Sequence, residues 1–171
     1  MESPKNMQQE ESDATEAFRN LPWVITDREM ITLYCGVIAQ TGAGKVLDIG
    51  MFMKRIGAVS RSFQEFALPE DAQLYGVDLV GGRQPVYRTI YRQITDAENY
   101  RRDFEAEHFE LGCILEISGL VDRRAYRDIW KWTAERVRYI LTEDEEMVRG
   151  LKDVRIADFQ IGQRTYYIAG F

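Results

Sequence analysis

Two apolar segments that end in a small or an acidic residue carry the clearest chemical signal of the sequence. They are Val46–Gly50, which reads Val-Leu-Asp-Ile-Gly, and Leu74–Leu79, which reads Leu-Tyr-Gly-Val-Asp-Leu. Each has the length and apolar content of a buried strand, and the residues between them suffice for a crossover helix. Doubly wound α/β sheets bind ligands at the carboxyl ends of such strands. We therefore expect a backbone turn at Gly50 and a carboxylate at Asp78 to lie at the ligand-binding edge of a parallel sheet.

Two other groups suggest chemistry, and their sequence context argues against both. The segment Gly42–Lys45 ends like a phosphate-binding loop, but that motif needs a glycine at the position of Ala39 and a hydroxyl residue at Val46. It also precedes a predicted strand instead of following one. His108 is the only histidine, so a Ser-His-Asp or Cys-His system would have to use it. It lies just before a predicted strand, at the end opposite Gly50, and we interpret it as a surface residue.

A basic and aromatic group follows Asp78. Tyr87 with Tyr91, and Arg88 with Arg92, are each four residues apart, so they would share faces of a predicted helix. They could frame a site for an anionic or aromatic substrate. The favoured interpretation is a solvated basic face on an acidic protein.

Length and composition limit the class of protein. The chain has 171 residues, 45% of them apolar and 29% charged, as in one soluble globular domain. It has no apolar run near the roughly 20 residues that cross a bilayer, and its polar start does not resemble a signal peptide. The net charge of −6 argues against a broad nucleic-acid surface. Cys35 and Cys113 are isolated and indicate reduced core residues in a cytoplasmic protein.

Periodicity and capping patterns place these residues on secondary structure. Residues 1–17 form a predicted flexible acidic tail and residues 18–171 one domain. Predicted helices run from Thr26 to about Gln40, after Gly50, from Pro85 through Tyr91, from the capping box at Thr95 to about Glu105, from Arg123 to about Glu135 with Asp122 as N-cap, and from the capping box at Thr142 to Gly150. Predicted strands are Val46–Ile49, Leu74–Leu79, Phe109–Ile117, Val137–Leu141, Val154–Gln160 and Thr165–Phe171, the last two forming a hairpin around Gly162. Trp130 and Trp132 share one helix at a spacing that places one of them in a surface patch.

The predicted fold class is therefore α/β: a single doubly wound, mostly parallel sheet with a C-terminal antiparallel hairpin. The segments Val46–Gly50, Tyr75–Asp78 and Tyr166–Phe171 resemble class I S-adenosylmethionine-dependent methyltransferases. The turn Ile49–Lys54 is similar to the first motif of small-molecule O-methyltransferases, in which an aromatic residue stands second after the glycine. The resemblance covers roughly residues 26–171.

The resemblance implies S-adenosylmethionine as cofactor and gives roles to individual positions. Asp48 would fix the turn or the cofactor's amino group, the turn at Gly50 would approach the methionine part, Asp78 would bind the ribose hydroxyls, and Glu116 would be the candidate general base. The implied cofactor-binding positions are Asp48, Gly50, Met51, Phe52, Asp78, Leu79, Asp96 and Ala97. The segment around Glu116 lacks the acidic cluster of metal-dependent O-methyltransferases, so we predict no metal.

Two functions remain open. One is a methyltransferase that transfers a methyl group to the oxygen or nitrogen of a small molecule. The other is a methyltransferase-like protein that no longer methylates and serves as a binding or scaffolding subunit. Lys54, at a position where the family usually has glycine, favours the second, because a long cation would narrow the cofactor slot. Open strand ends could be completed by a second copy or a partner protein, and we expect no association with membranes or nucleic acid.

Overall fold

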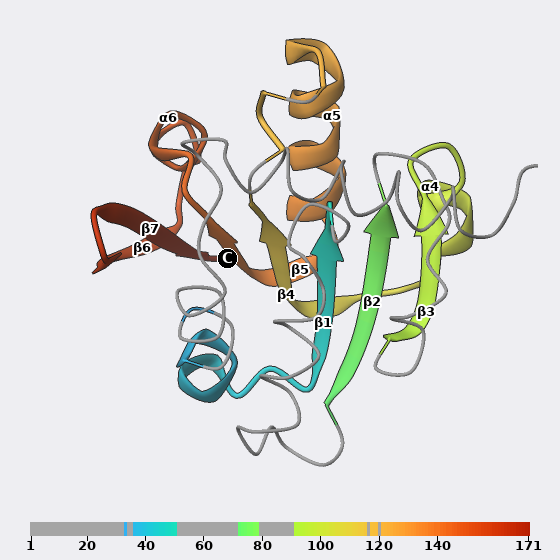
Figure 1. The fold of residues 1–171 in the computed structure, drawn as a ribbon, viewed down its shortest axis with the longest axis horizontal. Helices are drawn as coiled ribbons and strands as arrows, with labels where there is room; N and C mark the ends of the chain where they lie inside the picture. The colour runs from blue at the N-terminus through green and yellow to red at the C-terminus, as the bar shows by residue number, and fades with distance from the viewer. Residues whose placement is uncertain (1–32, 34–35, 51–71, 79–90, 116, 120) are drawn as a thin grey trace, which may run out of the picture.

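The computed structural model describes residues 33, 36–50, 72–78, 91–115, 117–119 and 121–171. Seven strands in these residues form one sheet in the order β3-β2-β1-β4-β5-β7-β6 (Figure 1). The strands are β1 (Lys45–Ile49), β2 (Gln73–Asp78), β3 (Tyr91–Asp96), β4 (Phe109–Ile114), β5 (Val137–Thr142), β6 (Arg155–Ile161) and β7 (Arg164–Gly170). The helices are α4 (Tyr100–Asp103), α5 (Arg123–Ala134) and α6 (Glu145–Arg149), and residues 36–41 are also helical.

The first five strands are parallel to one another, and β7 is antiparallel to both β5 and β6. The sheet is thus mostly parallel with a C-terminal antiparallel hairpin, which confirms the predicted fold class. The chain proceeds from β1 outward through β2 and β3, then returns to place β4 on the other side of β1. This reversal creates a switch point between β1 and β4.

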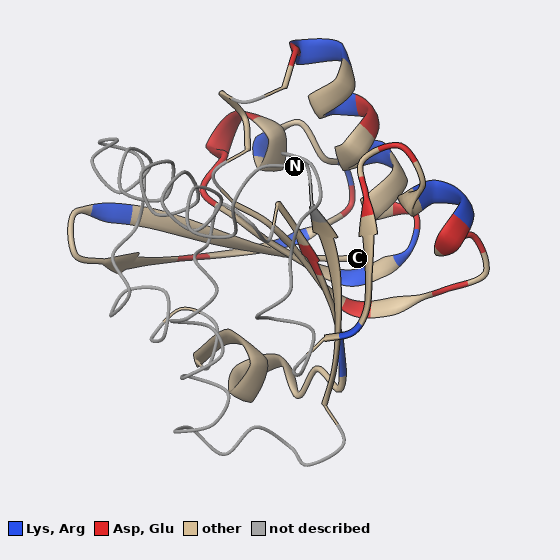
Figure 2. Cartoon of the chain, turned by 45° about the vertical axis from the view of Figure 1, so that its right-hand side comes forward, with Lys and Arg blue, Asp and Glu red and all other residues tan. Residues whose placement is uncertain are grey.

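Apolar clusters cover both faces of the sheet. On one face, Leu33, Val37 and Ile38 from the first helical segment pack with strand residues that include Leu141 and Tyr166. On the other face, α4 and α5 pack over β1, β2 and β4. Both helices carry charged residues of both signs (Figure 2), and these residues are exposed. Among the described residues, helix therefore packs against both faces of the sheet.

Several helix and turn predictions are confirmed. The Asp122 side chain caps α5 by accepting from the backbone N–H groups of Arg124 and Ala125, both at 2.9 Å. The first helical segment ends before Gly42, whose φ of 65° suits a helix stop. Gly162, with φ 62°, forms the tight turn of the β6–β7 hairpin.

The region after residue 90 differs from the prediction. Tyr91 and Arg92 lie on strand β3, so they do not share a helical face with residues four positions earlier. Thr95 is also in this strand. Its hydroxyl donates to Asp103 Oδ2 at 2.5 Å and does not cap a helix. The N-cap of α4 is Asn99.

The prediction for the two tryptophans is wrong. Trp130 and Trp132 are both buried, with 2% and 8% of their surface exposed, and they belong to one apolar cluster. The reason is α4, which widens the buried face of α5: Tyr100 meets the Trp132 ring edge-on at 4.9 Å. The Arg136 guanidinium lies 4.5 Å from the centre of the same ring.

Two smaller differences concern element ends. Strand β4 stops at Ile114, three residues before the predicted end. Helix α6 is capped by Asp144, which accepts from Met147 N at 2.9 Å, whereas Thr142 accepts from Asp144 N. The predicted tail and the helices after Gly50 and Pro85 lie outside the described residues. Within the described residues, no helix is both long and apolar enough to cross a membrane.

Candidate functional site

The carboxyl ends of four strands form one row. Ile49 pairs with Val77 on one side and with Ile114 on the other, and Asp78 pairs with Asp96. The next position along each strand places four residues side by side at this edge of the sheet: Asp96, Asp78, Gly50 and Leu115. The turn at the centre of the row is hydrogen-bonded to strand β2: Gly50 N donates to Val77 O at 2.8 Å.

Gly50 meets two requirements that only glycine satisfies. Its φ is 75°, in the left-handed region that side-chain-bearing residues rarely adopt. A Cβ atom at this position would also overlap Ile117 Cγ2. The chain after β4 therefore packs directly on the turn after β1. The two segments meet at the switch point, where open α/β sheets bind their ligands.

Asp48 lies just behind this turn, on the buried side of β1. Its Oδ2 accepts a hydrogen bond of 2.7 Å from the hydroxyl of Tyr91 on β3. Burial raises the pKa of Tyr91 well above its ordinary value, and the negative charge of Asp48 raises it further. Asp48 thus anchors the end of β1 from within, whereas its contact with a cofactor amino group stays a prediction.

The hydrogen bond between Tyr91 and Asp48 crosses the intervening strand β2. Gly76 on β2 pairs with Asp48, so no side chain stands at that position beneath the tyrosine. A glycine inside a predicted strand is a sequence signal for a close approach of this kind. Tyr91 is not among the predicted site residues, because its segment has the pattern of a helix.

Asp96 organises the turn that follows β3. Its Oδ1 accepts from the backbone N–H groups of Glu98 and Asn99 at 2.9 and 2.8 Å, and both carboxylate oxygens accept from Asn99 Nδ2. Hydrogen bonding from Asn99 lowers the pKa of Asp96. Ala97 is exposed in the same turn. These bonds leave acceptor capacity on Oδ2, and the predicted contact of Asp96 and Ala97 with an adenine ring stays a prediction.

The structure describes only some of the remaining predicted site residues. Met51, Phe52, Leu79 and Glu116 lie outside the described residues, and for Asp78 the structure gives the backbone position. His108 is exposed and precedes β4 at the opposite edge, as expected. Among the described residues no three His, Cys, Asp or Glu side chains gather as a metal site would need, and the predicted absence of a metal stays a prediction.

Sequence comparison gave no match, either to protein-family models or to curated proteins. Comparison of structures, in contrast, found similar proteins. The O-methyltransferase TomG from Streptomyces achromogenes, involved in tomaymycin synthesis and solved with S-adenosylmethionine, has a TM-score of 0.60 at 15% identity over 94% of this chain and 88% of its own. An O-methyltransferase from Bacillus cereus in complex with S-adenosylhomocysteine has a TM-score of 0.58 at 12% identity over 95% and 89%. Together with the strand order, this likeness shows that the chain has the fold of the class I S-adenosylmethionine-dependent methyltransferases.

Proposed function

We propose that this protein is an S-adenosylmethionine-dependent methyltransferase that acts on the oxygen or nitrogen of a small molecule. The observation that carries the proposal is the row at the switch point. There the left-handed Gly50 turn stands beside the in-register strand ends at Asp78 and Asp96. A turn without a side chain, next to strand ends at which acidic residues stand, is the arrangement that admits a nucleoside-bearing ligand.

The proposal assigns the residues at this edge to the parts of the cofactor in a definite order. The turn at Gly50, continued by Met51 and Phe52, would contact the methionine part. Asp78 would accept hydrogen bonds from the ribose hydroxyls. Leu79, Asp96 and Ala97 would then border the adenine, because β3 adjoins β2 on the side away from β1.

The cofactor would supply a methyl group on a positively charged sulfur. The substrate oxygen or nitrogen that takes up this methyl group would have to give up its proton to a base of the chain. Glu116 is the residue we propose as that base. The chain contributes mainly by holding both reactants in the attacking geometry, which can account for much of the rate enhancement.

A small substrate agrees with the charge of the surface. Acidic and basic residues are interspersed over α4, α5 and α6 (Figure 2), and the net charge is −6. A nucleic-acid substrate would normally call for a clear basic excess.

Titration calorimetry of S-adenosylhomocysteine against the full chain tests the proposal. We expect binding by the wild type and about tenfold weaker binding by Asp78→Ala, because hydrogen bonds to a charged group contribute about 1.5–3 kcal/mol. Asp158→Ala is the matched control: this exposed acid lies on β6, at the far side of the sheet, and its affinity should equal that of the wild type. Absence of both heat and thermal shift at millimolar ligand would refute cofactor binding.

The second candidate is a methyltransferase-like binding or scaffolding subunit. It is favoured by the engagement of two edge acids within the protein: Asp48 accepts from Tyr91 and Asp96 from its own turn. A protein that binds S-adenosylhomocysteine but methylates no member of a panel of phenols and amines would fit this candidate. Light scattering would then establish whether a second copy completes the open edge.

A further inference from the structure

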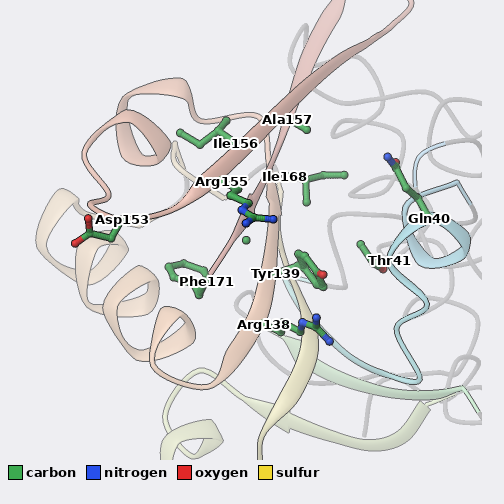
Figure 3. Close-up of a pocket in the computed structure, with 11 residues that line it drawn as sticks. Gln40, Thr41, Arg138, Tyr139, Asp153, Arg155, Ile156, Ala157, Ile168 and Phe171 are labelled. Atoms are coloured by element: carbon green, nitrogen blue, oxygen red, sulfur yellow. The ribbon is translucent and has the colours of Figure 1, made fainter.

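A cavity lies at the opposite edge of the sheet from the row of strand ends. It has a volume of about 520 Å³ and is bordered by the end of the first helical segment, the starts of β5 and β6, and the end of β7 (Figure 3). Because β5 begins at this edge, the cavity is separated from the Gly50 turn by the length of the strands. The proposed methyl transfer therefore makes no use of it.

The floor of the cavity is one row of residues across three strands. Tyr139 on β5 pairs with Gly170 on β7, and Gly170 pairs in turn with Arg155 on β6. Gly170 places no side chain in the middle of this row. A Cβ atom there would stand 3.2 Å from Tyr139 Cε1, so the tyrosine ring leans over the glycine. A hollow is left between the aromatic ring and the arginine.

Two guanidinium groups border this hollow. Arg155 projects into the cavity from β6, and Arg138 lies beside Tyr139, with its guanidinium 5.3 Å from the centre of that ring (Figure 3). Both side chains are exposed, and within the described residues neither forms an ion pair. Among the described residues of the lining, Asp153 is the one acid and Arg138 and Arg155 are the two bases, so this lining has an excess of positive charge in a chain whose net charge is −6.

We propose that this cavity binds a small anion built on a planar ring, either an aromatic carboxylate or an aromatic phosphate ester. Guanidinium groups bind carboxylate and phosphate through paired, charge-assisted hydrogen bonds. Arg155 and Arg138 would hold the anionic group, and the ring would pack against the Tyr139 ring and the Ile168 side chain. The cavity volume is within the range of sites that hold compounds of this size.

The balance of the lining argues for an anion over a neutral or cationic ligand. Apolar side chains from Ile156, Ala157 and Ile168 provide part of the wall, which suits a ring. A cation would have to approach two guanidinium groups that form no ion pair within the described residues, with the one carboxylate of Asp153 beside them. An uncharged ring would leave both guanidiniums without a partner.

Site-resolved NMR titration of the full chain tests this proposal. Benzoate and phenyl phosphate are the probes, benzamide is the uncharged counterpart, and inorganic phosphate is the anion without a ring. We expect benzoate or phenyl phosphate to shift the Gly170 amide and the Arg155 Nε–H signal, while benzamide and inorganic phosphate bind at least about tenfold more weakly. Which of the two probes binds more tightly tells whether the natural ligand is a carboxylate or a phosphate ester.

Substitutions assign the binding to the two arginines. Arg155→Gln and Arg138→Gln should each weaken the binding about tenfold and the double variant should abolish it, because each removes a charged donor. Arg127→Gln, an exposed arginine on α5, is the matched control and should bind as the wild type does. Both arginines are exposed, so thermal melting of the variants should match the wild type and show that they fold.

Three results would overturn the proposal. They are the absence of shifts at Gly170 at about 10 mM probe, equal affinity for benzamide and benzoate, and wild-type affinity in the double variant. None of these results bears on methyl transfer, because S-adenosylhomocysteine would bind at the other edge of the sheet.

Discussion

The Tyr91 hydroxyl reaches over Gly76 on β2 to bind the Asp48 carboxylate, two strands away in the sheet. This contact joins residues 43 positions apart in the sequence. It fixes the end of β1 just before the Gly50 turn, at the centre of the candidate site. The carboxylate itself could be foreseen from the sequence, as a residue that fixes the turn. Its partner could not, because only the register of three strands brings the tyrosine to it.

Removing this hydroxyl should change both stability and its pH dependence. Tyr91→Phe deletes a buried hydrogen bond to a charged group, so the free energy of unfolding at pH 7 should fall by about 2 kcal/mol. The folded pKa of Tyr91 is raised, so the unfolded chain loses this proton near pH 10 while the folded chain keeps it. The corresponding stability is present below about pH 10 and is lost as the pH rises above it.

Urea denaturation between about pH 8 and 11 measures this effect. The wild type should lose stability more steeply above about pH 10 than Tyr91→Phe does. Tyr126→Phe is a useful control, because burial also raises the pKa of Tyr126 but its hydroxyl donates to Asp144 near α6. That variant should share the shallower alkaline loss and keep the wild-type affinity for S-adenosylhomocysteine. Unchanged stability of Tyr91→Phe at pH 7 would contradict the role given to its hydrogen bond.

At the level of elements, the sequence predicts those whose pattern is complete within one segment. The buried strands β1, β2, β4 and β5, helix α5 with its cap and the terminal hairpin are all found. Strand β3 was missed because it lies at the sheet edge, where exposed polar residues such as Arg92 and Gln93 are tolerated. Thr95–Glu98 also satisfies the capping-box pattern, although in the structure Thr95 donates to Asp103. A local pattern could not reveal a partner that only the tertiary structure supplies.

The same limit applies to the candidate site. Gly50 and Asp78 could be placed at neighbouring strand ends, because both follow strongly apolar segments. That Asp96 belongs to the same row depends on the pairing of β3 with β2. The packing of Ile117 on Gly50 depends on the switch between β1 and β4. Neither relation can be inferred from the sequence of one segment alone.

The turn that ends β1 gives a test at this scale. Gly50→Ala should lower the free energy of unfolding by about 2 kcal/mol or more, because a left-handed conformation costs a non-glycine residue about 1–2 kcal/mol and the new methyl group overlaps Ile117. Gly36→Ala is the matched control. This glycine is helical and exposed, and a Cβ atom added there would meet no atom within 4 Å, so alanine should leave stability equal or higher. Chemical denaturation measures both, and equal stabilities for the two variants would contradict the argument.

For the whole molecule, the central strand is held by contacts distant in sequence. The backbone N–H of Lys45 donates to Glu110 Oε2 at 2.8 Å across 65 residues. The β6–β7 hairpin, in contrast, closes around Gly162 and Gln163. Long loops carry a larger closure entropy before their contacts form, so the two regions should order at different times during folding.

Pulse-labelled hydrogen exchange during refolding measures that order. We expect backbone amides of β6 and β7 to become protected before those of β1, whose neighbours β2 and β4 both lie far away along the chain. Protection of β1 as early as the hairpin would contradict this sequence of events.

The position of β1 also matters during synthesis on the ribosome. A chain made from its N-terminus exposes Lys45–Ile49 long before Phe109–Ile114 exists to pair with it. One side of an apolar central strand therefore stays open while residues 50–108 are being made, when nascent chains are prone to wrong associations. The switch point cannot form until both β1 and β4 have been made.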